Sequence, residues 1–132
     1  HMLLLKMKVE EYVQEDGNNP YRKWFDGLGI QAASKVATAT YRLSLGNLSS
    51  VKWIGQIGEY RIDWGPGYRI YLAKDAMELI ILFGGGTKKG QQADIQRAKE
   101  LFDEYKKRKK ASSKGGKAHS VRQESEKEEE LA

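Results

Sequence analysis

The spacing of apolar residues predicts a strand and then two helices in the first third of the chain. Residues 3–13 are apolar and then mixed, which indicates a strand at or near a sheet edge. Asn19 followed by Pro20 favours a helix start, because asparagine caps the first turn and proline fits the first helical position. The apolar residues that follow recur at spacings of three and four and so share one helix face. They are Tyr21, Trp24, Phe25 and Leu28.

A second helix is predicted from Gln31 to Leu45. Gly29 separates it from the first helix, and Gly46-Asn47 ends it, since both residues tolerate the left-handed backbone conformation. We expect the two helices to form an antiparallel hairpin. The expected buried stripe of the second helix is Ala33, Val36, Ala37 and Tyr41.

The middle of the chain has the pattern of short strands rather than the spacing of a helix. The candidate strands are residues 51–54, 57–64, 68–73 and 77–83. The last of these is nearly all apolar, as in a central strand covered on both faces. We expect a turn at Lys74-Asp75, a loop over residues 84–90 and a final helix from about Gln92. The apolar stripe of that helix is Ile95, Ala98, Phe102 and Tyr105. The order β-α-α-β-β-β-β-α predicts an α+β fold.

Gly65-Pro66-Gly67 predicts a tight reversal between two of these strands. Symmetric pairing about the proline places Arg61 opposite Tyr71 and Asp63 opposite Arg69. One face of the hairpin is then apolar and carries Tyr60, Ile62, Ile70 and Leu72. The other face is polar and carries Glu59, Arg61, Asp63, Arg69 and Tyr71.

Composition narrows the chemistry that this polar face can support. The 132 residues are enough for one domain, and they include no cysteine. The two histidines are His1 and His119, so neither lies in the predicted folded part. The commonest general base and metal ligand is thereby removed, and catalysis must use carboxylates, tyrosines, lysines and arginines. We expect no metal and no cofactor. The apolar run Leu79–Phe83 is too short to cross a bilayer, and a cytoplasmic location fits.

The positive charge is concentrated near the C-terminus. The formal net charge is +5, and from Lys106 onward the chain has nine basic and five acidic residues. A basic composition is therefore weak evidence that the folded part binds nucleic acid. We expect a domain over residues 3–105 and a charged segment over residues 106–132, either disordered or a partial helical extension of the last helix.

Two arginines and a tyrosine on a sheet surface are suited to binding a phosphodiester, because guanidinium groups bind phosphate oxygens bidentately. Lys88 and Lys89 follow a glycine run that could bring backbone N–H groups close to a phosphate. RNA supplies its own nucleophile, the 2′-hydroxyl group, so neither a metal nor a covalent residue is required. The alternatives are a surface ion pair between Asp63 and Arg69, a tyrosine that only covers the sheet, and glycines that only turn the chain.

Several motifs resemble, in the same order, the bacterial addiction module killer proteins, a HigB-like branch of the RelE/ParE toxin superfamily. The resemblance covers about Val9 to Tyr105. The motifs that carry it are Asn19–Phe25, Arg42-Leu43 with Leu45–Leu48, Glu59–Ile62, Gly65–Tyr71, Gly84–Lys88, and Gln92 with Asp94-Ile95.

The resemblance implies a RelE-like fold, in which an antiparallel sheet has an N-terminal helical hairpin on one face and a C-terminal helix. It also implies a cytoplasmic toxin of a type II toxin–antitoxin system. Its partner would be a cognate antitoxin, often a helix-turn-helix protein, and operator DNA would be reached only through that antitoxin. RelE-like members are mRNA interferases that cut messenger RNA in the ribosomal A site.

The resemblance also implies roles for individual residues. Arg61, Arg69 and Lys88 match the basic catalytic positions, and Tyr71 is the candidate for proton transfer or base stacking. We expect further RNA contacts from Lys52, Tyr68 and Lys89.

The sequence departs from RelE at two places. Asp63 stands where RelE has a lysine, and residues 91–97 lack the tyrosine that RelE has there. The general base is therefore open, with Glu59, Asp63 and Tyr71 as candidates. Two other functions remain open as well. ParE-like relatives share the fold but inhibit DNA gyrase, and an inactive homologue would act only as an antitoxin-binding regulatory module.

Overall fold

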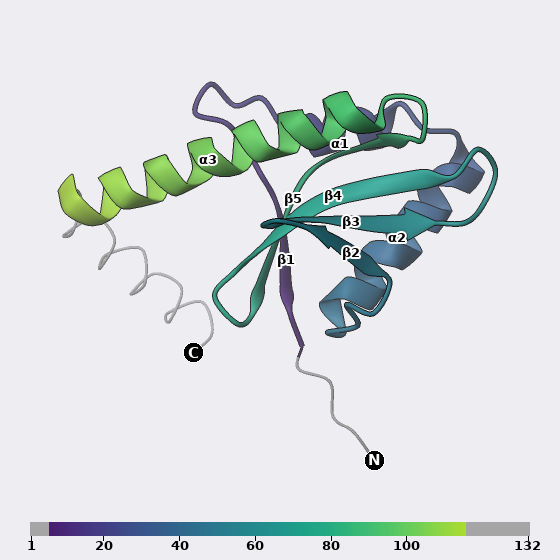
Figure 1. The fold of residues 1–132 in the computed structure, drawn as a ribbon, viewed down its shortest axis with the longest axis horizontal. Coiled ribbons are helices and arrows are strands. Elements are labelled where there is room, and N and C mark those ends of the chain that lie inside the picture. Colours follow the sequence, from purple (N-terminus) through teal and green to yellow (C-terminus); the bar gives the residue numbers. More distant parts are fainter. Residues whose placement is uncertain (1–5, 116–132) are drawn as a thin grey trace, which may run out of the picture. The chain divides into compact units, whose positions relative to one another are not determined.

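The computed structural model describes residues 6–115, and its elements follow the predicted order (Figure 1). They are β1 (Lys8–Glu11), α1 (Pro20–Asp26), α2 (Ile30–Ser44), β2 (Val51–Ile54), β3 (Ile57–Ile62), β4 (Tyr68–Asp75), β5 (Leu79–Thr87) and α3 (Gln91–Gly115). The chain divides into two compact units, one ending at Phe102 and the other beginning at Asp103. No helix within residues 6–115 is long and apolar enough to cross a membrane.

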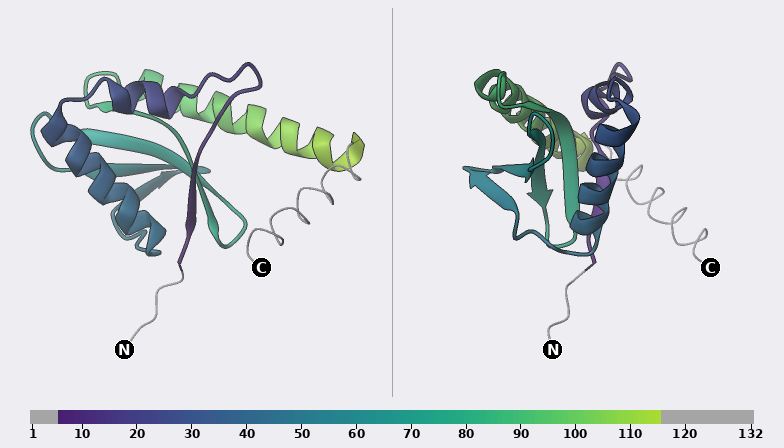
Figure 2. Two further views of the ribbon diagram at one scale, coloured as in Figure 1. Left: turned by 180° about the vertical axis from the view of Figure 1, so that it is seen from behind. Right: turned by 90° about the vertical axis from the view of Figure 1, so that its right-hand side faces the viewer.

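The α+β class is confirmed, with one difference in the sheet. Its strand order is β1-β5-β4-β3-β2, and β1 pairs with β5 in parallel while the other neighbours are antiparallel. The sheet is therefore mixed rather than wholly antiparallel. The reason is the connection between β1 and β2, which runs through α1 and α2 and carries the chain from one edge of the sheet to the other (Figures 1 and 2).

The predicted helical hairpin covers one face of the sheet (Figure 2). The Asn19 side chain caps α1 by accepting a hydrogen bond from the Arg22 backbone N–H at 2.9 Å, as the sequence predicted. The buried stripe of α2 differs from the prediction in three of its four residues. It is Ala32, Val36, Ala39 and Leu43. Tyr41 is 63% exposed, because the helix turns its Val36 side toward the sheet.

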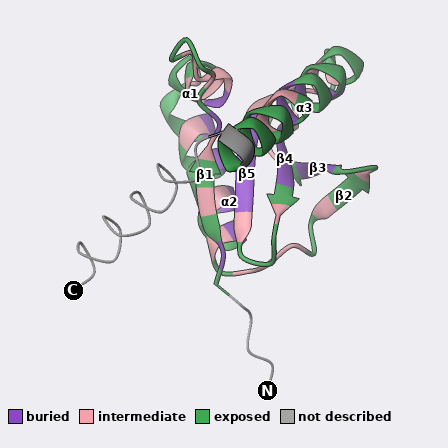
Figure 3. Cartoon of the chain, turned by 90° about the vertical axis from the view of Figure 1, so that its left-hand side faces the viewer, coloured by how far each residue is buried: buried purple, intermediate pink, exposed green. Residues whose placement is uncertain are grey.

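The opposite face of the sheet is covered by the first part of α3, up to Phe102. The predicted stripe is confirmed for three of its four residues, since Ile95, Ala98 and Phe102 are buried, whereas Tyr105 is only partly buried. The rings of Phe83 and Phe102 lie 5.7 Å apart between their centroids. Burial is greatest in the central strands, between the two helical layers (Figure 3).

The helix does not stop where the apolar stripe stops. It continues to Gly115, so residues 106–115 are helical, as in the alternative of a helical extension. The rest of the predicted charged segment, residues 116–132, lies outside the described residues.

The hairpin of β3 and β4 has a different register from the predicted one. Arg61 lies opposite Arg69, and Glu59 lies opposite Tyr71. Gly65 and Gly67 both have positive φ angles and form a longer turn, so Asp63 leaves the strand ladder. The shift is by two positions, and because side chains alternate, every residue that stays in the ladder keeps its predicted face.

The glycine run is strand rather than loop. β5 extends to Thr87 and includes all three glycines, and β4 extends to Asp75 where the sequence predicted a turn. A Cβ atom at Gly85 would collide with the ring of Trp24 from α1. A Cβ atom at Gly86 would collide with the carboxylate of Asp94 from α3. Close packing of both helices against β5 therefore requires glycine at these two positions.

Candidate functional site

A fully buried carboxylate, Glu59, is the centre of a polar cluster on the α3 side of the sheet. It accepts hydrogen bonds from Arg61 Nε at 2.9 Å, from Gln91 Nε2 at 2.8 Å and from the Tyr71 hydroxyl at 3.1 Å. Arg69 Nε lies 3.5 Å from its Oε2 atom, close enough for an ion pair. A buried charge is tolerated only when it is paired and hydrogen-bonded, and Glu59 meets both conditions.

The strand register explains why these residues meet. Glu59 lies opposite Tyr71 and Arg61 opposite Arg69, so all four side chains point to the same face. Lys52 of β2, on the other side of β3 from β4, is the strand-register partner of Glu59. Its side chain therefore points to the same face, where it is exposed. Helix α3 begins at Gln91, whose side chain donates a hydrogen bond to Glu59.

Hydrogen bonding keeps Glu59 ionised. Burial alone would raise its pKa, but the hydrogen bonds from Arg61, Gln91 and Tyr71, with the charge of Arg61, outweigh this effect. The pKa of Glu59 therefore lies below its usual value. The pKa of Tyr71 moves in the other direction, since burial and the neighbouring Glu59 carboxylate raise it well above its usual value. Tyr71 is thus a firmly protonated donor.

The two arginines differ in exposure. About half of the Arg61 side chain (49%) is exposed, whereas that of Arg69 is only 10% exposed. Arg69 Nε is buried and makes no hydrogen bond in the described structure, although it lies 3.5 Å from Glu59 Oε2 as an ion pair. Both guanidinium groups form ion pairs with the single Glu59 carboxylate.

The other predicted site residues lie apart from this cluster. Lys88 and Lys89 are exposed between β5 and α3. Asp63 is exposed beyond the end of β3, and Arg69 pairs with Glu59 rather than with Asp63. Tyr68 lies on the opposite face of the sheet, where its ring stacks on Trp64 with 6.1 Å between centroids.

Sequence reasoning missed two polar residues of α3 that lie against this face. Gln91 donates to Glu59, and Asp94 packs over Gly86. Burial raises the pKa of Asp94 above its usual value. For Asp94 the sequence offered two signals: its place in the motif formed by Gln92 with Asp94-Ile95, and its place in the first turn of a predicted helix, where an acidic residue ordinarily interacts with the helix dipole. Within residues 6–115, no three His, Cys, Asp or Glu side chains gather as a metal site would require.

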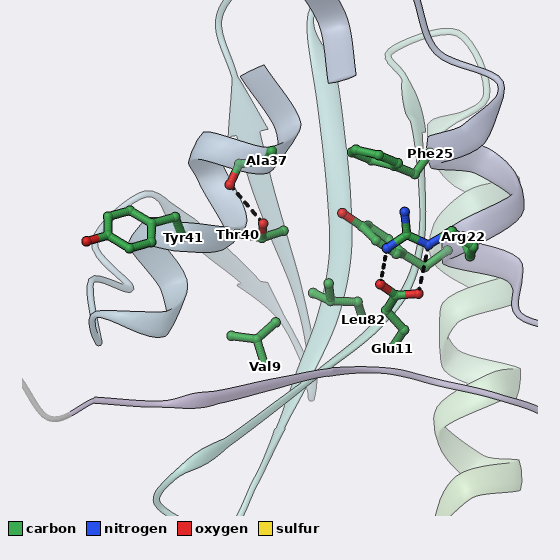
Figure 4. A pocket seen from close by; sticks show the side chains of 9 residues that line it. Val9, Glu11, Arg22, Phe25, Ala37, Thr40, Tyr41 and Leu82 are labelled. Atoms are coloured by element: carbon green, nitrogen blue, oxygen red, sulfur yellow. Dashed lines mark hydrogen bonds and ion pairs between the residues drawn. The ribbon is translucent and has the colours of Figure 1, made fainter. Parts of the chain in front are cut away.

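A separate cavity of about 310 Å³ lies on the helical-hairpin side of the sheet (Figure 4). An ion pair between Glu11 and Arg22 lies at this cavity, with Arg22 Nε 3.1 Å from Glu11 Oε1. The Arg22 hydrogen bond holds the pKa of Glu11 below its usual value, against the opposing effect of burial. The cavity is lined by Val9, Glu11, Tyr21, Arg22, Phe25, Ala37, Thr40, Tyr41 and Leu82. None of the predicted site residues lines it.

Comparison with known proteins gives a relative but no described activity. No family model matches the chain. An uncharacterized protein of Haemophilus influenzae is 38% identical over 86 residues, which are 64% of this chain and 87% of that protein. Identity of this degree over most of the relative indicates shared descent and a shared fold. The chain therefore belongs to the same family as this uncharacterized Haemophilus influenzae protein.

Proposed function

We propose that this protein is the toxin of a type II toxin–antitoxin system, a ribosome-dependent endonuclease that cuts messenger RNA in the cytoplasm. The observation that carries the proposal is the pair of arginines, Arg61 and Arg69, placed opposite each other on one sheet face and sharing a single buried carboxylate. The resemblance of the sequence motifs to RelE-like toxins supports the same reading. A cognate antitoxin would be the partner of the resting protein.

The charge balance of the cluster favours an anionic ligand. Like charges directly opposite each other on neighbouring strands repel. This face carries three basic side chains, Arg61, Arg69 and Lys52, against two carboxylates, Glu59 and Asp94. An RNA phosphate would supply the missing negative charge. Arg61 uses Nε for Glu59, which leaves its terminal amino groups for a bidentate contact with phosphate oxygens. Lys52, exposed on the neighbouring strand, is the third positive charge on this face.

The reaction we propose is transesterification by the RNA 2′-hydroxyl group. Negative charge develops on the phosphorane oxygens, and pre-placed arginines stabilise it more than they stabilise the ground state. Glu59 holds both arginines in place. Tyr71 is 1% exposed and donates its hydroxyl to Glu59, which favours a positioning role over proton transfer. Lys88 and Lys89 would contact the RNA backbone outside the cluster.

The test is mapping of RNA 5′ ends after a brief pulse of expression. Arg61→Ala is the informative variant, because Arg61 is half exposed and its loss should leave the fold intact. Arg42→Ala is the matched control, since Arg42 is an exposed arginine on α2, on the other side of the sheet. We expect new ends at regular codon positions with the wild-type protein and with Arg42→Ala, and their loss with Arg61→Ala.

Two outcomes would refute the proposal and indicate other functions. Growth arrest with unchanged RNA ends and DNA damage signalling would indicate a gyrase inhibitor. Normal growth with retained antitoxin binding would indicate an inactive homologue that serves as a regulatory binding module.

A further inference from the structure

Asp94 is a carboxylate that the described structure leaves without a partner. It lies in the first turn of α3 and is half-buried, and its carboxylate has no hydrogen bond or ion pair among residues 6–115. Its backbone N–H donates to the Gly90 carbonyl oxygen at 2.9 Å, which fixes the start of the helix. A half-buried, unpaired carboxylate is costly, and such groups are often retained for chemistry rather than for stability.

The position of Asp94 follows from the glycine below it. The Oδ2 atom occupies the space that a Cβ atom of Gly86 would fill, and Gly86 is the register partner of Arg69. Directly opposite residues of neighbouring strands point to the same face, so this oxygen lies on the face that carries the Arg69 side chain. Asp94 also acts electrostatically on the Tyr71 hydroxyl. The carboxylate is thus beside the arginine cluster and on the same face of the sheet.

We propose that Asp94 is the general base of the RNA cleavage reaction, accepting the proton of the attacking 2′-hydroxyl group. This inference rests on the proposed function. As the 2′-oxygen bonds to phosphorus, its proton passes to the Asp94 carboxylate. The bond from phosphorus to the 5′-oxygen breaks, and that oxygen leaves with a proton from water. The products are a 2′,3′-cyclic phosphate and a 5′-hydroxyl end, and Asp94 then releases its proton to solvent.

The other candidate bases are less suited to this step. Glu59 is fully buried, and its oxygens already accept hydrogen bonds from three side chains. Tyr71 is buried and protonated, and its hydroxyl donates to Glu59. Asp63 lies in the exposed turn beyond β3. Asp94 alone of these four combines partial exposure, a free carboxylate and a place above the arginine pair. Its pKa, raised by burial, also brings it closer to the range in which a base works well near neutral pH.

The test is single-turnover cleavage of a defined messenger RNA on purified, programmed ribosomes, measured from about pH 5 to pH 8. The charged and titratable groups on the strands beneath Asp94 are Arg69 and Tyr71 on β4 and Glu59 and Arg61 on β3. Along the chain, Lys88 and Lys89 precede Asp94 and Arg97 follows it. The variants are Asp94→Asn, Asp94→Glu and, as a control, Glu100→Gln. Glu100 is an exposed acidic residue of the same helix.

We expect Asp94→Asn to slow cleavage by about 100-fold or more, the typical contribution of a general base, with unchanged ribosome binding. The wild-type rate should rise with pH through one ionisation, and this acid limb should vanish in Asp94→Asn. Asp94→Glu should retain the limb at a reduced rate, and Glu100→Gln should match the wild type.

The inference is overturned if Asp94→Asn cleaves at the wild-type rate with the same pH profile, since Asp94 would then only support the helix start. If Asp94→Asn fails to fold, Asp94→Glu decides: a wild-type rate with an unmoved acid limb overturns the assignment, and a slower rate with a shifted limb supports it. A wild-type protein that cuts no RNA overturns the proposed function itself, and this inference with it.

Discussion

Replacing Glu59 by glutamine should strongly destabilise the protein, because it removes the buried carboxylate with which Arg61 and Arg69 both form ion pairs. Glu59 receives Arg61 on one oxygen and Tyr71 and Gln91 on the other. A glutamine side chain has a single oxygen, so in either orientation its amide group faces at least one donor that has lost its acceptor. The buried Arg69 also loses its counter-charge. Breaking a buried ion pair in this way costs about 3–5 kcal/mol of the free energy of unfolding.

The effect of Glu59→Gln should depend on pH. The pKa of Glu59 is lowered in the folded state, so its contribution to stability is fully present above the pKa of the unfolded chain, about 4.3. The contribution disappears as the pH falls through the lower folded pKa. The difference in the free energy of unfolding between wild type and variant should therefore be constant above about pH 5 and shrink at more acidic pH.

Urea denaturation, followed by circular dichroism between pH 3 and pH 7, measures both effects. Glu100→Gln is the control, because Glu100 is exposed and should change the free energy of unfolding by less than about 0.5 kcal/mol. A Glu59→Gln variant within about 1 kcal/mol of the wild type at pH 7, or a difference that does not change with pH, would refute the proposed energetics of the cluster.

Two further predictions concern other parts of the fold. Gly85→Ala should lower the free energy of unfolding by about 1–3 kcal/mol, because its methyl group would collide with Trp24. The control is Gly84→Ala, which should be nearly neutral because its Cβ position is open space. Thermal unfolding of both variants measures the difference. In ultraviolet titration Tyr21 and Tyr71 should ionise late, because burial raises the pKa of Tyr21 to about 12 and that of Tyr71 further. Tyr71→Phe should remove one late step, and its persistence in that variant would contradict the assignment.

The features that the sequence predicted well depend on local interactions. The Asn19 cap, the first residue of α1 and the apolar stripe at the start of α3 each follow from residues within one or two helical turns. The division of the β3–β4 hairpin into an apolar and a polar face was also predictable, since alternation survives a shift of two positions. The exact pairing of Arg61 with Arg69 was not, because it depends on the length of the turn around Gly65.

The features that the sequence could not predict depend on contacts between distant elements. The glycines of β5 were expected in a loop, but Gly85 and Gly86 make room for Trp24 and Asp94, which come from different helices. Glu59 was expected on a solvent-facing surface. It is buried because the start of α3 covers that face and Gln91 completes its hydrogen bonding. Neither fact is visible in the spacing of residues along one strand.

The parallel pairing of β1 with β5 protects the chain from aggregation while it folds during synthesis. β5 contains the most apolar stretch of the sheet, Ile80–Phe83, and an unpaired apolar edge would invite pairing with other chains. Its partner β1 is only four residues long and lies about seventy positions earlier. During synthesis β1 therefore leaves the ribosome first and is already present when β5 emerges. β1 can therefore cover the exposed edge of β5, the last and most apolar strand to be synthesised. Because β1 and β5 are far apart in the sequence, we expect their pairing to be a slow, late step of folding.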